Sequence, residues 1–277
     1  MNYLSCPVCK GLLKQNERSF RCKKGHSFDL SASGYLHLLP ANKMNSKLPG
    51  DNKLMVNARR NFLQKGYYHA ISDKLNEVIC AELKKLNKKE NLVLDIGCGE
   101  GYYTSKLNQA LSENKISAEI CGMDISKLAV NAAAKSCKEV KWAVASSFDL
   151  PVAEKSCDVL VNMFAPICMD EFSRVLKKNG ILVFAVSSTK HLWELKEAIY
   201  DEPYENKKED HQYEGFTFEA KHKVQDIIHL PNQEDISNLF TMTPYYYKSS
   251  VKTSERVAAL EKLDTQIDVD ILIYRKN

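Results

Sequence analysis

Four residues near the N-terminus have the types and the spacing of metal ligands. Cys6 and Cys9 form a C-x-x-C pair, and after twelve further residues Cys22 and His26 form a second pair in the segment CKKGH. Thiolates and an imidazole grouped in this way are typical of tetrahedral zinc. Because four protein ligands leave no open coordination position, the predicted zinc is structural and takes no part in a reaction.

The alternative for the first cysteine pair is a redox-active dithiol, but no thioredoxin-like βαβ pattern surrounds it. A segment of about thirty residues is too short to build its own core, so a metal would supply the missing folding free energy. The surrounding side chains are mostly basic, with two phenylalanines: Lys10, Lys14, Arg18, Phe20, Arg21, Lys23, Lys24 and Phe28. This mixture suits a zinc ribbon that contacts RNA phosphates, and the phenylalanines suit a small core equally well.

A second candidate site is the glycine-rich segment that follows the apolar run at 91–97. Asp95 lies two residues before Gly97-Cys-Gly-Glu100-Gly. Glycines permit positive φ and let backbone N–H groups approach a ligand, and the N-terminus of a following helix favours anions. The nicotinamide fingerprint G-x-G-x-x-G needs a glycine at 102, where this chain has Tyr102. The G-x-G-x-G pattern instead resembles motif I of Rossmann-like methyltransferases that use S-adenosylmethionine.

Two further positions fit the same methyl donor. Asp124 ends the predicted strand 118–124, where an acid would meet a ribose diol in a nucleotide-binding fold. Ser147 lies in SSFDLP after the predicted strand 140–146, where methyltransferases of this class hold the adenine. The alternative for Asp124 is helix capping together with Ser126.

The elements that would position these residues alternate along the chain. Apolar, β-like runs occur at 91–97, 118–124, 140–146, 157–164, 180–187, 222–230 and 268–275, and helical patterns separate the first five. This order predicts an α/β fold with a mostly parallel, doubly wound sheet of seven strands. We expect a zinc-binding module at 1–39, a linker rich in Pro, Asn and Gly at 40–53, and a methyltransferase domain at 54–277.

Composition excludes several other classes of protein. With 44% hydrophobic and 27% charged residues, the 277-residue chain is neither disordered nor a small disulfide scaffold. No apolar run reaches the ~18 residues of a membrane span, and the N-terminus does not resemble a signal peptide, so we expect a cytoplasmic protein. Residues 1–65 hold twelve Lys and Arg against three acidic residues, although the whole chain carries only +4. This basic region suits a polyanionic partner, or it is simply a solvated lysine-rich surface.

Together these segments identify a resemblance that extends over nearly the whole chain. The combination resembles the RlmA type of bacterial 23S rRNA guanine-N1 methyltransferases. The shared motifs are CPVC, CKKGHSFDL, GYLHLLP, ARR-x-FL at 58–63, LDIGCGEGYYT, VASS at 144–147, FAP at 164–166, HL-x-ELK at 191–196, EGFT at 214–217 and MTP at 242–244.

The resemblance implies a substrate, cofactors and site residues. It implies zinc at the four ligands named above and S-adenosylmethionine as methyl donor, with Tyr68, Gly99, Glu100 and His191 at positions that contact the donor. It also implies action on a 23S rRNA hairpin near the peptide exit tunnel, by homodimers whose zinc modules help to shape the RNA cleft. Two sister subfamilies modify neighbouring guanines, and the sequence does not choose between them.

Methylation at guanine N1 makes two further demands on the site. N1 carries a proton at neutral pH, so a group must accept it, and His191 or an acid of the glycine turn acting through water are the candidates. A base buried in a hairpin must be flipped out, which predicts an aromatic stacking partner. The candidates are Tyr68, Tyr102, Tyr103 and Phe164, each of which could instead pack in the core.

Two alternatives belong to other functional classes. A small-molecule methyltransferase would use the zinc module only for stability, and the basic N-terminal region argues against it. A non-catalytic, zinc-containing RNA-binding protein would need neither motif I nor Asp124, so their presence argues against that function.

Overall fold

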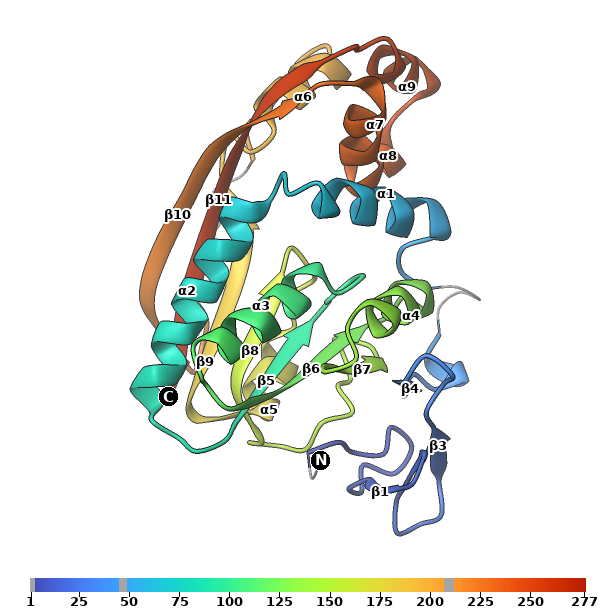
Figure 1. Cartoon of the computed structure of the whole chain (residues 1–277), viewed down its shortest axis with the longest axis vertical. Coiled ribbons are helices and arrows are strands. Elements are labelled where there is room, and N and C mark those ends of the chain that lie inside the picture. Colours follow the sequence, from blue (N-terminus) through green and yellow to red (C-terminus); the bar gives the residue numbers. More distant parts are fainter. Residues whose placement is uncertain (1–2, 45–48, 207–211) are drawn as a thin grey trace.

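The computed structural model describes residues 3–44, 49–206 and 212–277 (Figure 1), so part of the predicted linker, 45–48, lies outside the described residues. A sheet of eight strands forms the body, in the order β10-β11-β9-β8-β5-β6-β7-β4. Its strands are β4 (Tyr35–His37), β5 (Asn91–Ile96), β6 (Ala118–Asp124), β7 (Lys141–Val144), β8 (Cys157–Met163), β9 (Leu176–Ser187), β10 (Phe216–Leu230) and β11 (Leu263–Lys276). β4 to β9 pair in parallel, and β10 and β11 are antiparallel.

This architecture confirms the predicted class and all seven predicted strands, but the predicted strand number was wrong by one. The eighth strand, β4, lies in the N-terminal segment and extends the sheet beyond β7, with Leu36 opposite Ala143. Tyr35 and Leu36 are buried, and β4 covers an edge that β7 would otherwise leave unpaired. A run of three residues is too short for its periodicity to predict a strand.

Helices cover both faces of the sheet, and others lie beyond the carboxyl ends of its parallel strands (Figure 1). They are α1 (Lys53–Gln64), α2 (His69–Leu86), α3 (Tyr102–Glu113), α4 (Lys127–Ser136), α5 (Met169–Val175), α6 (Trp193–Ile199), α7 (Gln233–Met242), α8 (Tyr245–Lys248) and α9 (Val251–Ala258). In Figure 1, α2, α3 and α4 lie on the near face and α5 lies behind the sheet. In the part of the chain that the structure describes, no helix is long and apolar enough to cross a membrane.

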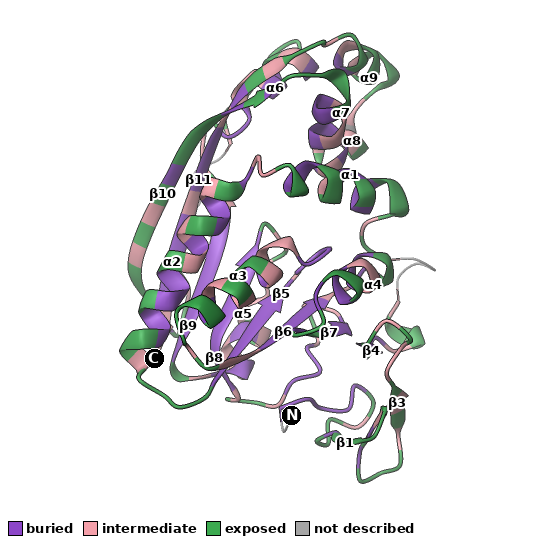
Figure 2. Cartoon of the chain, in the orientation of Figure 1, coloured by how far each residue is buried: buried purple, intermediate pink, exposed green. Residues whose placement is uncertain are grey.

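The core has two parts because alternate residues of a strand point to opposite faces. Val93 and Val159 pack into a cluster with α2, α3 and α4, whereas Leu94 and Leu160 pack into a second cluster. That second cluster also holds Phe172 of α5 and residues of the N-terminal segment. Figure 2 shows β5, β6 and β8 buried, while the edge strand β10 is largely exposed.

The N-terminal module is a three-stranded antiparallel sheet that packs on the second face. Its strands are β1 (Lys14–Asn16), β2 (Ser19–Arg21) and β3 (Ser27–Asp29), and a short helix, η1 (Ala41–Lys43), follows β4. Leu4, Leu13 and Phe20 are fully buried in the second cluster. The division of the chain into 1–39, 40–53 and 54–277 remains a prediction.

Candidate functional site

The four predicted zinc ligands come together in the N-terminal module. Their ligand atoms all lie within 4.8 Å of one another. Cys9 Sγ lies 3.6 Å from Cys22 Sγ, and His26 Nδ1 lies 3.5 Å from Cys6 Sγ and 3.3 Å from Cys22 Sγ. A tetrahedral zinc with ordinary bond lengths separates such ligand atoms by about 3.5–3.8 Å. The donor set therefore fits a closed, structural zinc site with His26 bound through Nδ1.

A large cavity lies at the carboxyl ends of β5, β6, β7 and β8, the edge at which open α/β sheets bind ligands. Its volume is about 1310 Å³, against about 300–1,000 Å³ for a typical small-molecule site. Helices α1 and α8 also border it. All eight residues predicted to contact the donor line this cavity: Tyr68, Asp95, Gly97, Gly99, Glu100, Asp124, Ser147 and His191.

The turn after β5 needs glycine for two reasons. Gly97 has φ +80° and a Cβ there would overlap that of Ala165, while Gly101 has φ +87° and a Cβ there would lie 2.7 Å from Trp142. The backbone N–H groups of Gly97 and Cys98 both donate to the Met123 carbonyl, at 2.8 and 3.1 Å. These contacts hold the turn against the end of β6 and leave the backbone close to the cavity.

Asp95 is a buried carboxyl group with one oxygen still available. Thr104 Oγ1 donates to Asp95 Oδ2 at 2.5 Å, and Oδ1 has no hydrogen-bond partner among the residues that the structure describes. Burial raises the pKa of Asp95 to about 7, the Thr104 hydrogen bond opposes this shift, and nearby Asp124 adds to it. A ligand donor at the cavity wall would satisfy the remaining oxygen.

Asp124 both lines the cavity and organises the backbone. The Gly99 N–H donates to Asp124 Oδ2 at 2.9 Å and the Ser126 N–H donates to Oδ1 at 2.7 Å. Ser126 itself caps α4, since its Oγ accepts from the Ala129 N–H at 3.3 Å. The carboxylate therefore links the glycine turn to the start of α4, and its cavity-facing position still fits a ribose diol.

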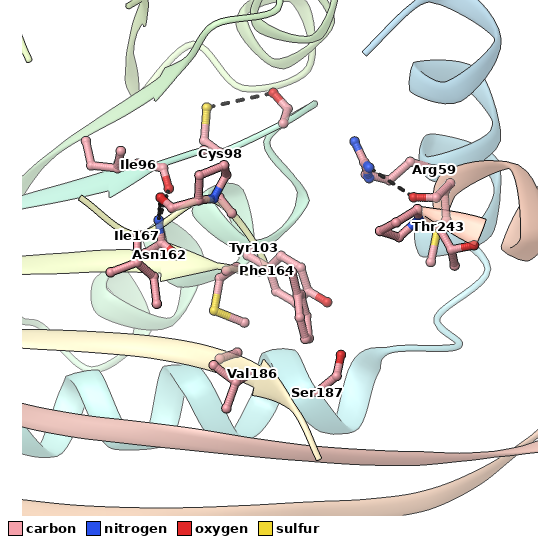
Figure 3. A pocket seen from close by; sticks show the side chains of 18 of the residues that line it. Arg59, Ile96, Cys98, Tyr103, Asn162, Phe164, Ile167, Val186, Ser187 and Thr243 are labelled. Carbon is pink, nitrogen blue, oxygen red and sulfur yellow. Dashed lines mark hydrogen bonds between the residues drawn. The ribbon is translucent and has the colours of Figure 1, made fainter. Parts of the chain in front are cut away.

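Glu100 is the second acid of the turn. It is buried, and burial raises its pKa to about 7 against the opposing charges of Arg59 and Arg60. Arg59 extends from α1 toward the cavity, where it pairs with Asp51 and donates to the Met242 carbonyl at 3.2 Å (Figure 3). An acid with a pKa near 7 is suited to exchange protons at neutral pH.

His191 and Tyr68 form a buried pair beneath the cavity. The Asp268 N–H donates to His191 Nδ1 at 3.2 Å, so the neutral ring carries its proton on Nε2, which lies 3.4 Å from Tyr68 Oη. Burial lowers the pKa of His191 to about 4. The charge of Asp268 opposes this shift, and the charge of Lys196 adds to it. In this tautomer the ring has no free lone pair that faces the cavity.

The segment after β8 carries an exposed aromatic ring in a constrained position. Phe164 has φ +56°, which is uncommon for any residue other than glycine, and 41% of it is exposed. Asn162 Nδ2 donates to the carbonyls of Ile96 and Pro166, at 3.2 and 3.3 Å, and so fixes the turn. Figure 3 shows Phe164 beside Tyr103, with ring centroids 6.5 Å apart. Backbone strain of this kind is common at functional sites.

Some cavity residues were not predicted from the sequence as site residues. They are Arg59, Lys221, Lys223, Tyr247 and Asp270. Lys223 lies 3.3 Å from Asp268 and Lys221 lies 3.5 Å from Asp270, across the β10–β11 pair. The ARR-x-FL motif marks Arg59 in the sequence. Lys221 and Lys223 lie on a C-terminal strand whose sequence pattern does not distinguish them from ordinary surface lysines.

Comparisons with known proteins agree with this geometry. Residues 4–47 match the sequence profile of the zinc ribbon described as "RlmA, N-terminal", and residues 87–241 match a methyltransferase domain. In solved structures, a chain of the complex between the Haloferax volcanii Trm112 methyltransferase activator and a methyltransferase superposes with a TM-score of 0.50 at 18% identity, covering 82% of this chain and 99% of its own. At that identity the likeness shows the fold alone.

Curated relatives identify the family more closely. A Bacillus subtilis (strain 168) protein, YxjB, provisionally named a 23S rRNA (guanine-N1)-methyltransferase, is 29% identical over 98% of this chain and 96% of its own. The 23S rRNA (guanine(748)-N1)-methyltransferase of Streptomyces fradiae is 32% identical over 72% of this chain and 68% of its own. The chain, a zinc ribbon joined to an S-adenosylmethionine-dependent methyltransferase domain, therefore belongs to the RlmA-type family of 23S rRNA (guanine-N1)-methyltransferases.

Proposed function

We propose that the protein transfers a methyl group from S-adenosylmethionine to N1 of a guanine in 23S rRNA. Family membership supports this activity. The observation that carries it is that the glycine turn, Asp124 and the Asn162–Pro166 turn meet in one cavity. Its volume exceeds what one small ligand needs, so a donor and a flipped base fit together.

The chain's own residues would hold the donor in three places. Backbone N–H groups of the glycine turn and the free oxygen of Asp95 suit the zwitterionic methionine end, Asp124 suits the ribose diol, and Ser147 suits the adenine. Bound S-adenosylmethionine supplies a methyl group on a sulfonium, whose S–C bond breaks as the bond to guanine N1 forms. The protein's main task is to align these atoms about 3–3.5 Å apart.

For the flipped guanine we propose Phe164 as the stacking surface. Its ring is exposed at the cavity, its backbone is fixed by Asn162, and its other face lies parallel to the His191 ring, with centroids 6.3 Å and planes 12° apart. Tyr68 and Tyr103 are less suited, since Tyr68 is buried and Tyr103 is less exposed than Phe164. Aromatic stacking on a flipped base is the general means by which such enzymes read unpaired bases.

The proton on guanine N1 leaves as the new bond forms. Glu100, acting through water, is a better acceptor than His191, because its pKa of about 7 matches the working pH and the pKa of His191 is about 4. We assign His191 a positioning role, since it supports Phe164 and orients Tyr68.

Other expectations from the resemblance remain predictions. They are a target hairpin near the peptide exit tunnel, a homodimer and a cytoplasmic location. The basic zinc module would contact RNA phosphates in such a complex.

The reaction is tested by incubating the protein with isotope-labelled S-adenosylmethionine and deproteinised 23S rRNA, then digesting the RNA to nucleosides for mass spectrometry. We expect label in 1-methylguanosine. Label in a small-molecule acceptor supplied in parallel, with none in RNA, would support the small-molecule alternative. RNA binding without donor binding would support a non-catalytic RNA-binding protein.

A further inference from the structure

The segment 146–153, between β7 and β8, forms one wall of the cavity. Ser146, Ser147 and Phe148 line it, and 63% of Phe148 is exposed. Two local hydrogen bonds shape this part of the segment. The Phe148 N–H donates to Ser146 Oγ at 3.2 Å, and the Asp149 N–H donates to the Ser146 carbonyl at 3.3 Å. Asp149 is the one charged residue among 146–149.

The same segment is bound by the N-terminal part of the chain. Lys10 of the zinc module and Lys43 of η1 each form an ion pair with a different oxygen of the Asp149 carboxylate. These two hydrogen bonds hold the pKa of Asp149 below its usual range even though burial alone would raise it.

Backbone contacts join the next residues of the segment to the start of the chain. The Ser5 N–H donates to the Pro151 carbonyl at 2.9 Å, and the Ala153 N–H donates to the Tyr3 carbonyl at 2.7 Å. Leu4 and Val152 form an antiparallel bridge between these two bonds. The module therefore contributes a short extra strand pairing to the outer side of the cavity wall.

These contacts lie on both sides of the first zinc-binding pair. Ser5 directly precedes Cys6, and Lys10 directly follows Cys9. Lys10 has φ +61°, and its N–H donates to the Cys6 carbonyl at 2.8 Å, which closes the turn between the two thiols. A metal held by both thiols would keep this turn closed and so keep Lys10 directed at Asp149.

Helix α5 of the body holds the later part of the segment through hydrogen bonds. Glu171 Oε2 of α5 accepts from the Leu150 N–H at 2.6 Å, and Arg174 donates to the carbonyls of Leu150 and Val152, at 2.8 and 2.7 Å. The part that lines the cavity, 146–148, lies before these contacts. The side chain of Asp149, the next residue, is bound by Lys10 and Lys43 of the N-terminal part of the chain.

We propose that the zinc module positions the donor-binding wall through Asp149, so that zinc binding and S-adenosylmethionine binding are coupled. The inference rests on the proposed function, because it takes the cavity as the donor site. A module attached only for RNA binding would need no such contact with this segment. Because coupling between two ligands is reciprocal, bound donor must raise the affinity for zinc by the same factor.

The first test measures the dissociation constant of S-adenosylmethionine by isothermal titration, with zinc-loaded protein and no RNA. The double variant Lys10→Ala/Lys43→Ala removes both ion pairs without touching the cavity. We expect about fivefold weaker donor binding, the upper range for exposed ion pairs. Lys14→Ala, an exposed lysine of the same module, is the matched control and should bind as the unmodified protein does.

Rescue separates positioning from general destabilisation. Lys10→Arg/Lys43→Arg keeps both charges and should restore the donor affinity. Asp149→Asn should weaken donor binding by a similar factor. The triple variant, which combines it with Lys10→Ala/Lys43→Ala, should bind the donor no more weakly than the double variant, because the three residues act as one unit. Zinc content and thermal midpoint, measured for each variant, show whether the module is still folded.

The second test measures the zinc affinity by equilibrium competition with a chelator that changes colour when it binds zinc. Saturating S-adenosylmethionine should raise the zinc affinity several-fold in the unmodified protein and much less in the double alanine variant. Equal donor affinity in all variants, together with a zinc affinity that the donor does not change, would overturn the inference while leaving the proposed function intact. Failure of the unmodified protein to bind the donor at all would overturn both.

Discussion

At the scale of single residues, the shape of the cavity depends on positions such as Gly97, where an added Cβ atom would overlap a neighbouring side chain. Gly97 and Ala165 come from different motifs, and they meet where the turn after β5 touches the segment after β8. In the proposed mechanism, the turn that binds the donor and the turn that presents Phe164 to the base are therefore in direct contact. A change at either position alters both.

Gly97→Ala should abolish donor binding. The new Cβ would overlap Ala165 and adopt an unfavourable positive φ, so the turn must move. Gly215→Ala is the matched control, because Gly215 has nearly the same φ, +78°, with no atom within 4 Å of the added Cβ. Titration calorimetry and thermal unfolding of both variants check this. Equal donor affinity in both would show that the contact with Ala165 is not needed.

Phe164→Ala should lower methyl transfer to RNA by about tenfold to a hundredfold, since base–aromatic stacking contributes about 1–3 kcal/mol. Phe164→Tyr keeps the ring and should retain most of the rate. The measurement is single-turnover transfer, with donor affinity determined in parallel. A rate for the alanine variant equal to that of the unmodified protein would assign the stacking role to another residue.

The single-turnover rate should rise with pH below about 7 and level off above it. A base works when deprotonated, and Glu100 loses its proton near pH 7, whereas His191 is already neutral above about pH 4. Glu100→Gln should remove the rise. A rate that does not change between about pH 5 and 8 would argue for an acceptor with a low pKa, and one that climbs without levelling would indicate direct proton loss to solvent.

At the scale of elements, the buried strands could be predicted from sequence and the short edge strand could not. β5, β8 and residues 181–186 of β9 are mostly apolar runs, and their alternating side chains divide between two cores. β4 has three residues, and its pairing depends on the open edge of β7, which no local pattern encodes. The same holds for the contact of Lys10 with Asp149, two residues 139 positions apart in the chain.

The donor side of the site could be predicted better than the acceptor side. Gly97, Glu100 and Asp124 lie at fixed offsets from strands that are easy to recognise. By contrast, Arg59 and Lys223 reach the cavity because α1 and β10 fold over it from opposite ends of the chain. Their place at the cavity depends on long-range packing, so the ARR-x-FL motif marked Arg59 without placing it there, and no motif marked Lys223.

The zinc module should require all four ligands as a unit. Cys9→Ser should reduce bound zinc from about one ion per chain to nearly none and should unfold β1–β3, because the small sheet has little core of its own. Cys168→Ser, a partly exposed cysteine outside the ligand set, should keep the zinc. Elemental analysis and limited proteolysis measure both. Full zinc content in Cys9→Ser would exclude Cys9 as a ligand.

At the scale of the whole molecule, each face of the sheet is covered by different elements, and the cavity lies at the edge formed by the carboxyl ends of the parallel strands. Helices α2, α3 and α4 cover the first face, the zinc module and α5 cover the second, and the cavity opens at the carboxyl edge between them. The basic N-terminal region is fixed to the body through buried side chains such as Leu4 and Phe20. This arrangement joins the basic N-terminal region and the cavity through one sheet.

The central claim is methylation of one guanine at N1, and reverse transcription tests it most directly. A methyl group on N1 blocks the Watson–Crick edge, so a reverse transcriptase stops one nucleotide before the modified base. We predict one new stop, opposite a guanine, on 23S rRNA treated with protein and S-adenosylmethionine, and none when the donor is omitted or Gly97→Ala is used. Unchanged read-through on RNA that has accepted labelled methyl groups would contradict N1 as the target atom.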